Sequence, residues 1–245
     1  AISGAFASVY QVTTPQGRWA LRCFVREVSD TRKRYEEISK TLKSLRLLYT
    51  TEFEFQPNGI RVSGKLYPIV KMQWMTGELL GDYVANNINN PQRLAQLAQK
   101  WAVMMTDLNS RGIAHGDLQH GNVLVVNHEL KLIDYDGVHV PGMELGQGSE
   151  SGHKHFQHPQ RDTRHHGPGI DRFSFVAIDV SLAALIEDPS LFRRYGEGGE
   201  TILFRANDFA DPAHSEVFDA LQRITGLRGA VKNLATVCRA PIEAV

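Results

Sequence analysis

Residues 115–122 read HGDLQHGN and residues 134–137 read DYDG, and these two stretches are the most informative part of the chain. Two short β-prone runs joined by a polar turn separate them. The two ends of a β-hairpin meet at one edge, so Asn122 at its entrance and Asp134 at its exit should lie together. Asp117 stands shortly before that same end. We therefore expect oxygen-bearing side chains, most of them anionic, to converge beside the hairpin.

This combination of side chains has a chemical meaning that its members lack singly. Asp and Asn are common turn residues beside strands, so one such residue alone indicates little. Together they offer carboxylate and amide oxygens, which Mg²⁺ prefers, and a further carboxylate that can orient an attacking hydroxyl and accept its proton. These are the requirements of phosphoryl transfer.

The two motifs resemble those of the protein kinase superfamily, whose catalytic loop reads HRDLxxxN and whose metal motif reads DFG. The resemblance makes Asp117 the catalytic base. It makes Asn122 and Asp134 the metal ligands, and it places Leu124 under the adenine of ATP. It implies a bilobal α+β fold, with a small β-rich N-lobe and a mainly helical C-lobe, that uses ATP and Mg²⁺ as cofactors.

The resemblance continues at the front of the chain, although only one of the three glycines of the family's glycine-rich loop is present. It implies a loop with Phe6 at its tip and Val9 over the base, with Ala20 against adenine and Met72 as gatekeeper. Two hinge residues would face the adenine edge through their backbone groups. The nucleotide-binding residues implied in this way are Gly4, Phe6, Val9, Ala20, Arg22, Glu37, Met72, Gln73, Met75 and Leu124.

Several positions depart from the family pattern. Arg22 stands where the family has its phosphate-binding lysine; arginine keeps the charge but is longer and planar, so the phosphate contact is either shifted or lost. Its carboxylate partner would be Glu37 or Glu36. Gly116 replaces the arginine that reads a phosphorylated activation loop, so we expect no switching through that residue. Gln119 stands where Ser/Thr kinases carry a phosphate-steadying lysine.

The run from Asp171 to Ile186 is apolar on nearly every side, which predicts a helix buried all round. Its start, DRFS, resembles the start of the family's central helix. The aspartate of that helix holds the catalytic loop from below, and the resemblance gives this role to Asp171.

Hydrophobic periodicity divides the chain into a strand-rich front and a helix-rich back, which indicates the α+β class. We expect an N-lobe over residues 1–75 and a C-lobe over residues 76–245. Strands are predicted at 6–12, 18–25, 52–55, 60–62, 66–74, 122–126 and 130–133, with a β-like piece at 201–204, and helices at 30–48, 79–87, 91–111 and 171–186.

The composition excludes several classes of protein. The 245 residues include 27 Lys+Arg against 27 Asp+Glu, so the chain lacks the basic surplus of a protein that grips nucleic acid through phosphates. Its 2 cysteines allow neither a disulfide framework nor a four-cysteine zinc site. No stretch approaches the roughly 18 apolar residues of a membrane span, and no signal peptide is recognisable. We expect a cytoplasmic protein with no membrane or nucleic-acid partner.

The histidines are unevenly distributed. Of 10 in the chain, six lie between the metal motif and the central helix: His139, His153, His155, His158, His165 and His166. They form either a metal cluster or a packed loop held by hydrogen bonds, and few carboxylates and no cysteines accompany them. A third interpretation aligns the HPQ at 158–160 with the family's APE motif at the substrate shelf.

Three functions fit the sequence. The first is an ATP-dependent protein-kinase-like enzyme that transfers the γ-phosphate to Ser or Thr of a protein substrate. The second is a pseudokinase that binds nucleotide or a regulatory protein partner without catalysis, which Arg22 and the incomplete glycine-rich loop favour. The third is a small-molecule kinase resembling aminoglycoside phosphotransferases, but the short stretch between Met75 and Pro91 leaves little room for their acceptor pocket.

Overall fold

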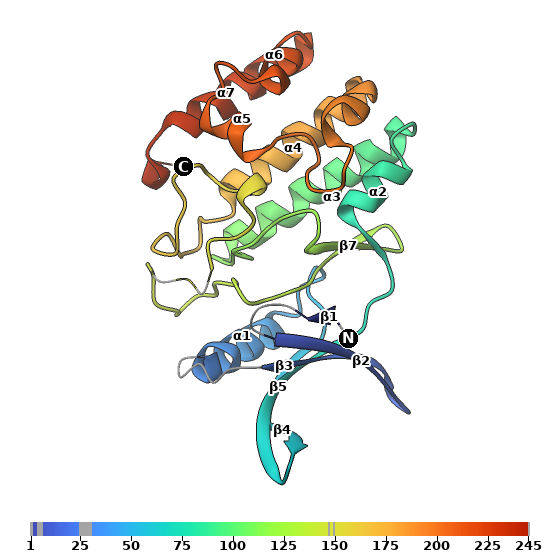
Figure 1. Cartoon of the computed structure of the whole chain (residues 1–245), viewed down its shortest axis with the longest axis vertical. Coiled ribbons are helices and arrows are strands. Elements are labelled where there is room, and N and C mark those ends of the chain that lie inside the picture. The colour runs from blue at the N-terminus through green and yellow to red at the C-terminus, as the bar shows by residue number, and fades with distance from the viewer. Residues whose placement is uncertain (1, 4–6, 25–30, 147, 149, 245) are drawn as a thin grey trace. The chain divides into compact units, whose positions relative to one another are not determined.

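The computed structural model of the chain describes residues 2–3, 7–24, 31–146, 148 and 150–244. The chain divides into two units, Ala1–Thr76 and Gly77–Val245, which run from blue to cyan and from green to red in Figure 1. The first is built mainly of strands and the second mainly of helices. This is the α+β organisation that the periodicity predicts.

The strands are β1 (Ile2–Ser3), β2 (Ala7–Thr14), β3 (Gly17–Phe24), β4 (Phe53–Val62), β5 (Lys65–Gln73), β6 (Glu78–Leu79), β7 (Val123–Val126) and β8 (Glu129–Leu132). The α-helices are α1 (Thr31–Leu45), α2 (Leu80–Asn86), α3 (Pro91–Ser110), α4 (Arg172–Glu187), α5 (Ala206–Ala210), α6 (Glu216–Gln222) and α7 (Arg228–Arg239). Short 3₁₀ turns cover Lys154–Phe156, Thr225–Leu227 and Ile242–Ala244, and a π turn covers Phe192–Gly196.

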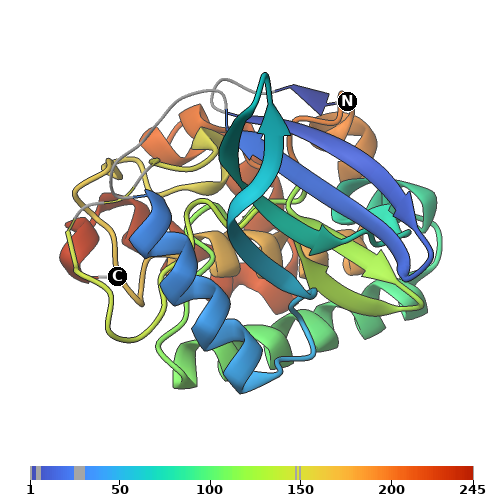
Figure 2. The ribbon, with the colours of Figure 1, turned by 90° about the horizontal axis from the view of Figure 1, so that it is seen from below.

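The described part of the first unit contains a five-stranded antiparallel sheet in the order β1-β2-β3-β5-β4. Helix α1 packs against it through Tyr35, whose ring stacks on Phe55 at 6.0 Å and also contacts Phe53. Ile38 and Leu42 continue the same buried helix face, at the three- and four-residue spacing that predicted this helix. Figure 2 shows α1 alongside the strands.

The second unit is organised around α3 and α4, which contact each other along their lengths. Helix α3 begins where Asn90 accepts the N–H of Arg93 and Pro91 occupies the first turn. Trp101 of α3 is fully buried, stacks on Phe175 of α4 at 6.1 Å and donates its indole N–H to the Phe175 carbonyl. Most side chains of α4 are buried, which confirms the prediction of a helix enclosed on nearly every side.

The β-like piece predicted at 201–204 is not a strand. All four residues are buried, but they follow an irregular path with no strand partner among the described residues. The carbonyl of Ile202 lies so close to Gly196 that a Cβ there would approach it to 2.4 Å. The β-prone composition therefore reflects burial rather than sheet pairing, since Ile, Leu and Phe serve both. Among the described residues, no helix is long and apolar enough to span a membrane.

The packing of Trp101 gives a test of this core. Trp101→Ala should lower the free energy of unfolding by about 3–5 kcal/mol, because it opens a cavity between α3 and α4 and leaves the Phe175 carbonyl without its donor. Val103→Ala on the same helix, where the side chain is 57% exposed, should change it by less than about 0.5 kcal/mol. Urea unfolding measures both, and equal losses would contradict the assigned core.

Candidate functional site

The hairpin β7–β8 brings Asn122 and Asp134 to one end of the small sheet in the second unit. Val123 pairs with Leu132, and Ile133 donates its N–H to the Asn122 carbonyl at 3.0 Å. Asn122 is thus directly opposite the residue that precedes Asp134. The backbone convergence expected from the hairpin is present.

Asp117 is joined to this hairpin end by its own hydrogen bonds. The side-chain amide of Asn122 donates to the Asp117 carbonyl at 2.9 Å and to its carboxylate Oδ2 at 2.8 Å. The other carboxylate oxygen, Oδ1, accepts the backbone N–H of His153 at 2.6 Å. Both carboxylate oxygens are therefore engaged, one by the hairpin and one by the segment that follows the metal motif.

Gly152 makes this last contact possible. A Cβ at Gly152 would lie 2.6 Å from Nε2 of Gln157 and 3.0 Å from Oδ1 of Asp117, and its φ is +72°. Only glycine combines that backbone conformation with so close an approach. The segment around residue 152 therefore lies directly against the carboxylate of Asp117.

Asp171, just before α4, supports the loop from the other side. Its carboxylate accepts the backbone N–H groups of His115 and Gly116, the latter at 2.9 Å, and the residue is only 2% exposed. Burial raises the pKa of Asp171, while the neighbouring His115, Arg161 and the two N–H groups act in the opposite direction. The contact between this aspartate and the loop before Asp117, which the family resemblance implies, is present.

Both ring nitrogens of His115 have hydrogen-bond partners. Its Nε2 lies 2.8 Å from the carbonyl of Ile133 and must donate, whereas Nδ1 accepts the N–H of Asp117 at 3.4 Å. The ring thus connects the loop of residues 115–122 to the end of β8. It orients the backbone of Asp117 relative to the Asp134 turn.

Gly116 occupies a position where no side chain fits. Its φ is +81°, and a Cβ would lie 2.0 Å from the carbonyl oxygen of Gly137. The family's arginine at this position is therefore sterically excluded here, not merely replaced. Gln119 is also used structurally, since its Oε1 accepts the Gly121 N–H at 2.9 Å.

A group of carboxylates surrounds this loop. Burial, reinforced by the charges of Asp117, Asp136 and Asp134, raises the pKa of Glu150 to about 7, and the positive charge of Arg161 opposes this shift. Asp134 itself is exposed and has a φ of +61°, which Asp tolerates better than most residues. The described residues include no group of three or more His, Cys, Asp or Glu side chains arranged to hold a metal ion.

In the first unit, the sheet register aligns four of the residues implied for nucleotide binding. Val9 is the cross-strand partner of Arg22, and Ala20 is the partner of Met72. Because alternate residues of a strand share a face, Ala20 and Arg22 lie on the same side, and so do their partners. Gly4 and Phe6 lie outside the described residues.

The remaining implied residues lie in different elements. Glu37 is half-buried on α1, Gln73 ends β5 with its N–H donated to the Glu52 carbonyl at 2.9 Å, and Met75 follows in the irregular stretch after β5. Leu124 is in β7 of the second unit and is 9% exposed.

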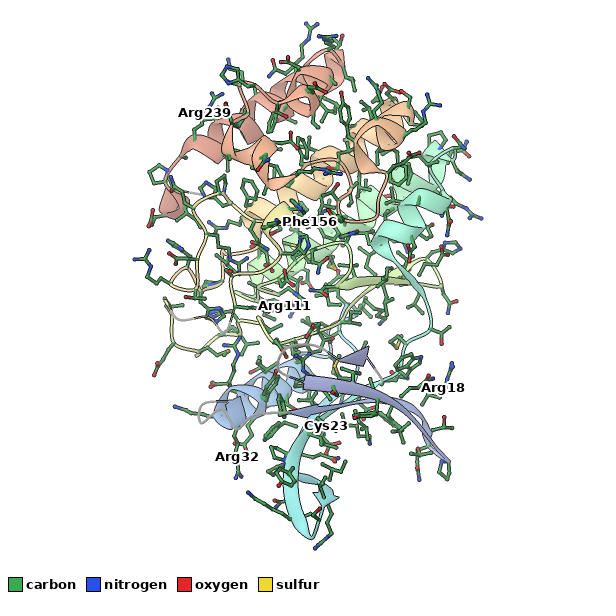
Figure 3. All side chains as sticks on the ribbon, in the orientation of Figure 1. Arg18, Cys23, Arg32, Arg111, Phe156 and Arg239 are labelled. Atoms are coloured by element: carbon green, nitrogen blue, oxygen red, sulfur yellow. The ribbon has the colours of Figure 1, made fainter. Side chains whose placement is uncertain are left out.

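The histidine-rich segment is a packed loop held by hydrogen bonds. His158 donates from Nε2 to the Val237 carbonyl and accepts the Gln160 N–H on Nδ1, and His155 accepts the Ala206 N–H. Burial lowers the pKa values of both His155 and His158, which favours neutral rings. His153 belongs to the same segment, and its ring centroid lies 5.6 Å from that of Phe156, which is labelled in Figure 3.

Three groups near Asp117 could not be predicted from the sequence. Glu150, the His153 amide and Arg161 lie in the long aperiodic segment between the metal motif and α4, where neither spacing nor composition marks them. The approach of this segment to Asp117 depends on the path of the whole loop. A lone Arg or Glu in such a loop has no pattern to distinguish it.

Comparisons with known proteins support the architecture. No protein-family model matches the sequence, and no curated protein matches it. The structure is similar to the crystal structure of the yeast RNA Pol II CTD kinase CTDK-1 complex, with a TM-score of 0.52 and 19% sequence identity. The similarity covers 71% of this chain and 58% of that chain. The chain therefore has a protein-kinase-like fold: a small antiparallel sheet followed by a mostly helical region.

The steric restriction at Gly116 can be measured against a second glycine. Gly112 also has a positive φ, +66°, but a Cβ there would meet nothing nearer than 3.7 Å. Gly112→Ala should cost about 1–2 kcal/mol of unfolding free energy from backbone strain alone. Gly116→Ala should cost about 1–3 kcal/mol more, from the clash with the Gly137 carbonyl. Chemical denaturation compares them, and equal losses would refute the close approach.

The pKa of Glu150 predicts a pH dependence of stability. Burial raises this pKa from 4.5 to about 7, so the folded state holds the proton more tightly than the unfolded state between these values. Stability from this group is present at low pH and is lost as pH rises toward 7 and above. Glu150→Gln should match wild type near pH 5 and be more stable at pH 8. Thermal unfolding without divalent cations, with exposed Glu144→Gln as control, measures this; a pH-independent difference would contradict it.

Proposed function

We propose that this chain, which has a protein-kinase-like fold, is a phosphotransferase that moves the γ-phosphate of ATP to a Ser or Thr hydroxyl of a protein. The observation that carries the proposal is the fixed position of Asp117. Its carboxylate is held by the side chain of Asn122 at the entrance of the hairpin that also carries Asp134, and its loop is anchored by buried Asp171. These groups lie within a single unit.

Asp117 supplies the base of the reaction. The hydroxyl oxygen of the substrate forms a bond to the γ-phosphorus, the bond from that phosphorus to the bridging oxygen of ADP breaks, and the hydroxyl proton passes to the Asp117 carboxylate. The hydrogen bond from Asn122 to Oδ2 orients this carboxylate. Positioning of the reacting groups and electrostatic stabilisation together account for most of the rate enhancement in phosphoryl transfer.

The donors at the hairpin end fit Mg²⁺ chemically. Asn122 turns its amide nitrogen to Asp117, so its carbonyl oxygen faces away from that carboxylate. Asn122 and Asp134 would hold the ion, with phosphate and water oxygens completing its shell, as is usual for Mg²⁺ in nucleotide sites. When bound, the ion neutralises charge on the phosphates.

The first unit would bind the nucleotide on one face of its sheet. Ala20 and Met72 are cross-strand partners there and offer apolar surface to a base, with Val9 beside Arg22 on the same face. Arg22 would supply positive charge to the phosphates in place of a lysine. Glu37 on α1 is its proposed carboxylate partner, and Gln73 and Met75 would contact the adenine edge through their backbone.

A second candidate function rests on a different observation. Both carboxylate oxygens of Asp117 are already hydrogen-bonded within the chain, Oδ2 to the side chain of Asn122 and Oδ1 to the amide of His153. If this contact persists with nucleotide bound, the chain is a pseudokinase that binds nucleotide or a protein partner without transfer.

Asp117→Asn tests the proposed function. Phosphate transfer from γ-labelled ATP to a protein substrate should fall by about 10²–10⁴-fold, because the variant lacks a base. The variant should still bind ATP, which a thermal shift measurement in the presence of Mg²⁺ detects. Asp107→Asn, which alters an exposed ion pair with Arg111, is the matched control and should keep full activity. A wild-type chain that shifts with ATP yet transfers no phosphate would replace this proposal by the second candidate.

A further inference from the structure

Arg161 connects the catalytic loop to the segment that follows the metal motif. Its Nη2 donates to the carbonyl of Gly116, and its Nη1 donates to Oε1 of Gln157. Among the Arg residues that the structure describes in the second unit, Arg161 alone is half-buried and all the others are exposed. Its planar guanidinium thus contacts two segments that are distant in sequence.

The charges around this guanidinium are negative. Burial lowers the pKa of Arg161, while the negative charges of Asp171, Asp117 and Glu150, in that order, act in the opposite direction. A group of carboxylates this close would repel one another and carry a large desolvation cost without a cation among them. Arg161 supplies that cation next to the proposed base.

The position of this arginine is explained by the geometry of Gly116. The family resemblance places an arginine at 116, immediately before the base, but here a side chain would collide with the Gly137 carbonyl. The guanidinium instead comes from the other side of the loop, and it contacts the backbone of the same residue, Gly116. The N–H of Gly116 is bound to Asp171, so both polar groups of this residue are engaged.

The second contact of Arg161 extends to the face of Asp117. Gln157, which accepts from Arg161, packs against Gly152, where a Cβ would lie 2.6 Å from its Nε2. The next residue, His153, donates its N–H to Oδ1 of Asp117. One guanidinium therefore supports the loop that carries Asp117 and also the segment that covers it.

We infer that Arg161 is the positioning residue of this site: from the segment that follows Gly137, its guanidinium joins the Gly116 carbonyl to the side chain of Gln157. It fixes the Gly116–Asp117 backbone and the segment 152–157 relative to each other without contacting the reacting atoms. This inference rests on the proposed function for its kinetic consequence, but its structural consequence is independent of catalysis.

The experiment compares Arg161→Gln and Arg161→Lys with Arg164→Gln. Arg164 belongs to the same segment, but its side chain is 82% exposed and pairs with Asp162, so it is the matched control. In Arg161→Gln, kcat for phosphate transfer should fall by about 10²-fold, as expected when a catalytic group is displaced by about 1 Å. The KM for ATP should stay within about twofold, since ATP contacts are unchanged. Arg161→Lys, which keeps the charge but loses the two-point contact, should recover part of kcat.

Hydrogen–deuterium exchange of the same proteins provides a readout that needs no activity. Peptides covering 112–122 and 150–158 should exchange faster in Arg161→Gln, by about tenfold, while peptides of α3 and the Arg164→Gln control remain as in wild type. If the wild-type chain transfers no phosphate but Arg161→Gln still shows this exchange pattern, the inference is supported and the proposed function fails. Two results would overturn the inference. One is an Arg161→Gln variant with the kcat and the exchange rates of wild type, and the other is a uniform loss of protection that Arg161→Lys does not reduce.

Discussion

The carboxylate of Asp171 is buried at the start of α4 and accepts the N–H groups of His115 and Gly116. A buried carboxylate without such donors would cost several kcal/mol, so the loop of residues 115–122 and helix α4 stabilise each other. The loop can hold Asp117 in one orientation only because its preceding backbone is bound in this way. The rest of the site is built outward from this contact.

The loop of residues 115–122 is held by contacts to several other segments. His115 links it to the end of β8, Asn122 links Asp117 to the start of β7, and Arg161 links it to the segment before α4. Each contact engages backbone as well as side-chain atoms. The arrangement compensates for Gly116, because the position that lacks a side chain is surrounded by groups that bind its backbone instead.

Several histidines contribute to the same scheme as hydrogen-bonding rings. In His115 and His158 one ring nitrogen donates to a carbonyl while the other accepts an N–H. Imidazole suits such bridges because its two nitrogens point in different directions and, in the neutral form, have opposite roles. Burial lowers the pKa of His120 as well, and its Nε2 pairs with the Gly199 carbonyl at 2.8 Å. The metal-cluster interpretation of the histidine-rich segment has no support among the described residues.

The sequence by itself determined the strand-rich and helix-rich halves, the hairpin that joins Asn122 to Asp134 and the buried α4 that begins at Asp171, because periodicity and short-range spacing specify each of them. It could not determine the path of residues 135–170, which have no periodic pattern. Nor could it show that 201–204 is irregular, because buried apolar residues suit strands and packed loops alike. Only the tertiary structure places Glu150 and Arg161 beside Asp117, since contacts between segments depend on how the whole loop packs rather than on local preference.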